Sequence, residues 1–104
     1  MNENEILIKV FDIAKVDFVG SRFAGEEIRK IIDSAISKNK KAILDFENIS
    51  GITQSFGDEI IGIYIRAFGI DFVKNNIEII NANDKIRTIL NSVANYSKKL
   101  RKTA

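Results

Sequence analysis

The chain has 104 residues, of which 45% are hydrophobic and 29% are charged, and its formal net charge at pH 7 is +2. This length fits one domain with a single hydrophobic core, and so small a charge does not by itself indicate nucleic-acid binding. The absence of Cys excludes disulfides and thiol chemistry, and the absence of His removes the commonest general base and metal ligand.

The chain also lacks the sequence features of membrane insertion and secretion. Its longest apolar runs cover only a few residues, well short of the roughly 20 that a membrane-spanning helix needs. The first five residues lack the basic and apolar regions of a signal peptide. We therefore expect a cytoplasmic protein with no membrane partner.

The first third of the chain predicts two strands and one amphipathic helix. Residues 6–11 and 16–19 are apolar extended runs, and residues 12–15 between them have the length of a hairpin loop. Ser21 is the predicted N-cap of a helix that ends near Asn39. The apolar positions of this helix share one face: Phe23, Ile28, Ile31, Ile32, Ala35 and Ile36.

The two later strands indicate a sheet with one covered face and one partly open face. Residues 42–47 alternate, with Ala42, Leu44 and Phe46 on one face and Ile43, Asp45 and Glu47 on the other. The run 77–80 likewise includes Glu78 among isoleucines. Strands buried on both faces would instead be continuously apolar.

Two further helices complete the predicted elements. The first begins near Ser55, ends at Gly69 and contains Gly57 and Gly62, which indicate close approach to a neighbouring strand or partner. Residues 70–75 are a predicted loop. The last helix begins within residues 81–84 and frays after Tyr96 or Ser97, which predicts a domain over 1–97 and a basic tail over 98–104.

Alternating strands and helices predict parallel strands joined by right-handed crossovers. The expected fold is a single α/β domain with a mainly parallel or mixed four-stranded sheet and helices predominantly on one face.

Ser55 is the sharpest candidate for a functional residue, and it also has a structural interpretation. Ser55 and Asp58 have the spacing of a capping box, in which Ser55 is the N-cap. Asp58 and Glu59 are a carboxylate pair, but neighbouring helical residues point about 100° apart and converge poorly on one atom. We therefore expect no enzymatic activity.

Other candidate ligands have simpler explanations. Asp45, Glu47 and Thr53 supply too few oxygens for a hard cation, and a solvated sheet face with Lys9 as cross-strand partner explains the carboxylates. Arg22 is a candidate anion ligand or a surface residue. The basic tail has no accompanying aromatic platform, so we expect it to be solvated and not to bind nucleic acid. We expect neither a metal nor a cofactor.

Residues 42–60 also resemble a known family. Leu44-Asp45-Phe46, Ile49, Ile52 and the helix start Ser55–Ile60 are similar to bacterial STAS-like domains, relatives of the anti-sigma-factor antagonists. The resemblance implies this α/β fold and a kinase-like ATPase partner that phosphorylates Ser55. This chain has Thr53 and Phe56 where the antagonists have an acidic residue and a glycine.

These observations predict a non-enzymatic regulatory module that binds a signalling protein through residues 48–60. The predicted partner-binding residues are Ser50, Thr53, Gln54, Ser55, Phe56, Asp58 and Glu59. Two alternatives stay open. One is a nucleotide or small-anion binder at the helix starts near Ser21, Ser55 and Asn83. The other is a structural homodimer formed through the open sheet face.

Overall fold

The computed structural model describes residues 3–103. The predicted domain over 1–97 and the predicted tail over 98–104 therefore each extend beyond the described residues, at residues 1–2 and at residue 104. The elements in chain order are β1 (Glu5–Lys9), α1 (Val10–Ala14), β2 (Phe18–Val19), α2 (Arg22–Ser37), β3 (Lys41–Asp45), β4 (Gly51–Ile52), α3 (Gln54–Gly57), η1 (Asp58–Gly62), α4 (Ile63–Phe68), α5 (Ile70–Asn76), β5 (Ile77–Ile80) and α6 (Asp84–Thr103). Within residues 3–103, no helix combines the length and the apolar character needed to cross a membrane.

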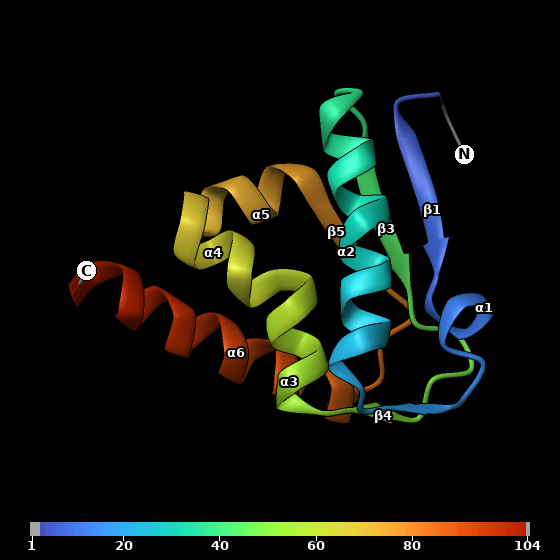
Figure 1. The fold of residues 1–104 in the computed structure, drawn as a ribbon. Coiled ribbons are helices and arrows are strands. Elements are labelled where there is room, and N and C mark those ends of the chain that lie inside the picture. The colour runs from blue at the N-terminus through green and yellow to red at the C-terminus, as the bar shows by residue number, and fades with distance from the viewer. Residues whose placement is uncertain (1–2, 104) are drawn as a thin grey trace.

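The predicted α/β fold with parallel strands is confirmed. β1, β3 and β5 form one sheet in the order β1-β3-β5, and both pairs are parallel. One face of this sheet, with Ile8 and Leu44 at its centre, packs against α2 and the other helices (Figure 1). The opposite face includes the exposed side chains of Lys9 and Glu78, as the strand patterns predicted.

The predicted hairpin near the N-terminus is wrong. The first strand ends at Lys9, and the chain then forms the short helix α1, because Val10 is fully buried and Lys15 closes the helix in a left-handed conformation. β2 pairs in parallel with β4, a strand that the sequence did not predict. The expected four-stranded sheet is therefore a three-stranded sheet and a separate two-stranded one.

Two predicted helix boundaries also change. Residues 70–75 are helical rather than a loop, since the ring of Phe72 packs on those of Tyr64 and Phe68 and so holds α5 against α4. α6 does not fray after Tyr96 but continues to Thr103. The Arg101 guanidinium supports this extension by donating hydrogen bonds to two carbonyl oxygens near the end of α4.

Residues 54–68 form one continuous helix, here called the central helix, which comprises α3, η1 and α4. Its middle segment, η1, is a π-helical turn, a feature frequently found at functional sites. Two glycines permit close packing around it. Gly57 lies against Val93 of α6, and Gly25 of α2 lies against Glu59. The neighbour at Gly57 is the helix α6, whereas the sequence indicated a strand or a partner.

Substituting Gly25 tests the contact between α2 and the central helix. An added Cβ would lie 2.6 Å from the Cβ of Glu59, so the backbones must separate. The energetic cost of overpacking exceeds the gain in helix propensity from glycine to alanine. We therefore expect Gly25→Ala to lower the free energy of unfolding by about 1–2 kcal/mol. The control Glu26→Ala, at the exposed neighbouring position, should change it by less than about 0.5 kcal/mol in urea titrations. Equal stability of both variants would contradict this close packing.

Candidate functional site

The loop between β3 and α3 forms one edge of the molecule together with three helix starts. The Ser50 N–H donates to the Asp17 carbonyl oxygen at 2.7 Å, which ties the loop to the chain before β2. The Asn83 side chain donates to the Ser50 carbonyl oxygen at 3.0 Å, which ties it to α6. We call loop 48–54 with the starts of α2, α3 and α6 the rim; β4 and α3 mark it at the lower edge of Figure 1.

Each helix start at the rim is capped by the side chain of the residue at its N-cap. The Ser21 hydroxyl oxygen accepts from the Ala24 N–H, and the Asn83 side-chain oxygen accepts from the Ile86 N–H. The central helix is capped by Thr53, whose hydroxyl oxygen accepts from the Phe56 N–H at 3.2 Å. The predicted capping by Ser55 is therefore wrong. Thr53 is the better cap because its hydroxyl also donates to the Gly20 carbonyl oxygen and so joins two helix starts.

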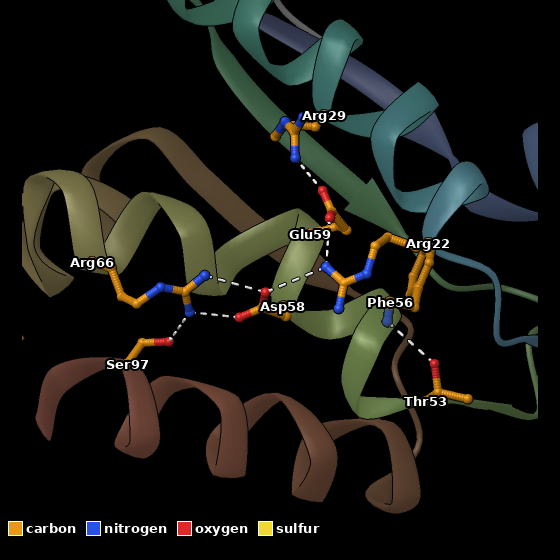
Figure 2. A network of polar contacts seen from close by, with 8 residues as sticks. All are labelled: Arg22, Arg29, Thr53, Phe56, Asp58, Glu59, Arg66 and Ser97. Carbon is orange, nitrogen blue, oxygen red and sulfur yellow. Dashed lines mark hydrogen bonds and ion pairs between the residues drawn. The ribbon is translucent and has the colours of Figure 1, made fainter. Parts of the chain in front are cut away.

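A chain of charged side chains runs behind the rim from α2 to α6 (Figure 2). We call it the arginine ladder; its members in order are Arg29, Glu59, Arg22, Asp58, Arg66 and Ser97. Glu59 accepts hydrogen bonds from both Arg29 and Arg22, the latter at 2.7 Å. Asp58 receives two hydrogen bonds from Arg66, at 2.6 and 3.2 Å. The ladder thereby connects α2, the central helix and α6.

Glycine spacing makes room for the ladder. Gly25 and Arg29 lie four residues apart on α2, and Glu59 occupies the space above Gly25. Gly62 and Arg66 repeat this spacing, and an added Cβ on Gly62 would lie 2.4 Å from an Asp58 oxygen. In each case, the missing side chain lets a carboxylate reach an arginine.

The π-helical turn aligns Asp58 with Arg66. In a regular α-helix, residues eight positions apart differ by about 80° in direction, so the two side chains would diverge. The wider turn of η1 reduces this divergence, and the guanidinium extends back over Gly62 to the carboxylate. The π-helical turn is therefore part of the site's geometry.

The carboxylates of the ladder are committed to arginines. Glu59 is only 4% exposed and faces α2, whereas Asp58 faces Arg66; the two carboxylates meet only at Nη1 of Arg22, at 2.7 Å from Glu59 and 3.7 Å from Asp58. The hydrogen bond to Glu59 raises the pKa of Arg22, and that to Asp58 raises the pKa of Arg66, so both remain cations. With three guanidinium groups and two carboxylates, the ladder is net positive.

The structure separates the predicted partner-binding residues by exposure. Ser50, Gln54 and Ser55 are exposed, and Thr53 and Asp58 are half-buried. Phe56 is fully buried in the core, and Glu59 lies beneath the surface. Phe56 and Glu59 therefore cannot contact a partner directly. The sequence analysis missed Arg29, Arg66 and Ser97. The repeated spacing of a glycine four residues before an arginine was the available signal.

The carboxylates on β3 and in the following loop do not gather into a cation site. Asp45 is buried, and its Oδ1 accepts from the Asn81 side chain and from the Glu47 N–H, both at 2.9 Å. Lys9 is its neighbour in register, as expected, but the expected solvated position of Asp45 is wrong, because the residue is only 8% exposed. Among residues 3–103, no group of three or more acidic side chains is placed to hold a metal ion.

A groove of about 410 Å³ lies between the central helix and α6. Its polar lining residues are Arg22, Gln54, Ser55, Asp58 and Arg66, and its apolar ones are Val93, Tyr96 and Leu100. We call it the α6 groove. It joins the arginine ladder to the exposed part of the rim at Gln54 and Ser55.

Removing the charge of Glu59 tests the ladder. Glu59→Gln keeps the shape but leaves two guanidinium groups without their carboxylate, and breaking a buried pair is strongly destabilising. Because Arg22 is half-exposed, we expect a loss of about 2–4 kcal/mol in the free energy of unfolding. The matched control Glu27→Gln breaks a surface pair with Lys30 and should cost less than about 1 kcal/mol. Similar losses for both in urea titrations would rule out a structural role of the ladder.

Comparison with known proteins identifies one family. Residues 24–87 match the family described as STAS-like domain of unknown function (DUF4325), a segment that begins within α2 and ends in the first turn of α6. No curated protein and no solved structure matches the chain. The matched segment contains the central helix and most of the rim, and the chain therefore belongs to this family of STAS-like domains.

Proposed function

We propose that this chain is a non-enzymatic regulatory module that binds a signalling protein through the rim. Its binding surface comprises the exposed residues Ser50, Gln54 and Ser55 and the half-buried Thr53 and Asp58. Following the resemblance to the anti-sigma-factor antagonists, the proposed partner is a kinase-like ATPase.

The observation that carries the proposal is a pair of exposed aromatic side chains at the rim, Phe18 and Phe23. Of the seven large hydrophobic residues that are exposed among residues 3–103, four come from segment 11–23, namely Phe11, Val16, Phe18 and Phe23. The ring of Phe18 lies over Gly51 of the loop, and Phe23 lies in the first turn of α2 with 63% of its surface exposed. Gathered exposed apolar residues beside polar ones are typical of protein-binding surfaces.

The arrangement of the carboxylates supports a non-enzymatic role. A general acid or base must reach a substrate proton. Glu59 is buried between two arginines, and both oxygens of Asp58 accept from Arg66. The two side chains are engaged in holding helices together.

Specific observations favour the rim over the two alternatives. A nucleotide at the helix starts would need free backbone N–H groups, but at each start one of these donors already bonds to Ser21, Thr53 or Asn83. A homodimer through the open sheet face would need exposed apolar area, but there Ile43 is 5% exposed and Leu7 and Ile80 are half-buried.

Ser55 is the proposed site of phosphorylation. It is exposed in the first turn of the central helix, where a phosphate gains from the helix dipole. Asp58 and Glu59 would repel that phosphate in isolation, but Arg22, Arg29 and Arg66 offset their charges. The local electrostatics therefore support this proposal.

Photo-crosslinking in the native cells tests the rim as a partner surface. With p-benzoylphenylalanine at Ser50, we expect a specific crosslinked protein, identified by mass spectrometry. The same group at Asn75, which is exposed on α5 away from the rim, should not capture that protein.

A matched pair of substitutions then tests the apolar contribution. Phe23→Gln should reduce the Ser50 crosslink about tenfold, as expected for the loss of a buried aromatic anchor. Phe68→Gln removes an equally exposed phenylalanine at the opposite end of the central helix and should leave the crosslink unchanged. Capture from Asn75 equal to that from Ser50, or equal effects of the two substitutions, would refute the proposal.

A further inference from the structure

The positive charge of this protein is concentrated in α6. The helix contains one acidic residue, Asp84, and six basic ones, Lys85, Arg87, Lys98, Lys99, Arg101 and Lys102. Its net charge of +5 compares with +2 for the whole chain, so the remainder carries −3. Four of the six cations lie in the last two turns, where the α6 groove ends at Leu100.

The α6 groove combines cationic and apolar surfaces on opposite walls. Val93, Tyr96 and Leu100 project from α6, and Tyr96 is 60% exposed. The facing wall includes Arg22, whose side chain is 53% exposed. Its hydrogen bond to Glu59 and its ion pair with Asp58 both involve Nη1, which leaves the N–H donors of Nη2 and Nε for a further acceptor.

We propose that the α6 groove binds an acidic protein segment in which carboxylates alternate with apolar side chains. A carboxylate of the segment bonds to Arg22, next to Ser55 and Gln54, and an apolar side chain packs on Tyr96 and Leu100. The cations in the last two turns of α6 lie outside the groove, with Lys98, Arg101 and Lys102 around a neighbouring pocket, and they act on the remaining carboxylates as a long-range positive field.

The shape of the groove favours a peptide over other anionic partners. A single extended peptide strand can lie along an open groove of about 410 Å³ and contact both of its walls. The apolar wall of Val93, Tyr96 and Leu100 has no counterpart in a phosphate backbone, which is charged along its whole length. An acidic segment with apolar side chains fits both walls.

This inference rests on the proposed function, because the groove shares Gln54, Ser55 and Asp58 with the proposed partner surface. It specifies the chemistry of the partner segment. Crosslinking from Ser50, which does not line the groove, remains an independent test of the rim.

Fluorescence anisotropy with a labelled synthetic peptide of alternating glutamate and leucine tests the inference. We expect the full chain to bind this peptide and not its glutamine–leucine counterpart, with affinity that falls as salt is added. Ser55→Glu places a carboxylate in the groove at an exposed first-turn position that tolerates acidic residues, and should weaken binding about tenfold or more.

The control Asn75→Glu changes the net charge equally at an exposed position outside the groove and should alter the affinity by less than about twofold. Circular dichroism establishes that both variants are folded.

Equal binding of the two peptides, no binding of either, or equal effects of the two substitutions would overturn the inference. The inference would also be overturned if the chain bound phosphatidylserine vesicles or an oligonucleotide more tightly than the glutamate–leucine peptide, and if Ser55→Glu abolished that binding. If peptide binding fails while the Ser50 crosslink persists, this inference alone falls; a missing crosslink refutes the proposed function.

Discussion

The buried carboxylate of Glu59, held between Arg22 and Arg29, is the interaction on which the other features of the site depend. A carboxylate that is 4% exposed is costly to bury unless cations and hydrogen bonds surround it. Both arginines come from α2, so satisfying Glu59 fixes the distance and the rotation between α2 and the central helix. Gly25 is required for the same reason, since a side chain there would collide with the Cβ and Cγ atoms of Glu59.

The orientation of Glu59 also decides what its neighbours can do. With Glu59 toward α2, Asp58 faces Arg66, and Arg66 in turn reaches Ser97 on α6. The resulting ladder crosses three helices and holds their starts at the rim. A surface built on fixed elements loses little conformational entropy when a partner binds, so such a scaffold suits the interaction role that we propose.

Much of the fold was predictable because burial repeats along each element with a regular period. Alternation in residues 42–47 and the spacing from Ile28 to Ile36 identified the core-facing positions of β3 and α2. Two expectations were wrong: Phe23 is 63% exposed, and Ile43 and Asp45 on the other face of β3 are also buried. The errors fall on short elements. β4 has two residues and α1 has five, too few for a period to appear, and each exists because of contacts with distant parts of the chain. Ser55 was misassigned as the cap because local spacing could not reveal the bond between Thr53 and Gly20.

The α/β class, the covered face of the sheet and the lack of histidine and cysteine chemistry follow from composition and from local periodicity. The pairing of β2 with β4, the cap at Thr53 and the arginine ladder depend instead on how distant segments of the chain pack together. The two bonds to Glu59 join residues 30 and 37 positions apart in the chain. No local pattern specifies which charge meets which across such a separation, because that depends on how two helices pack.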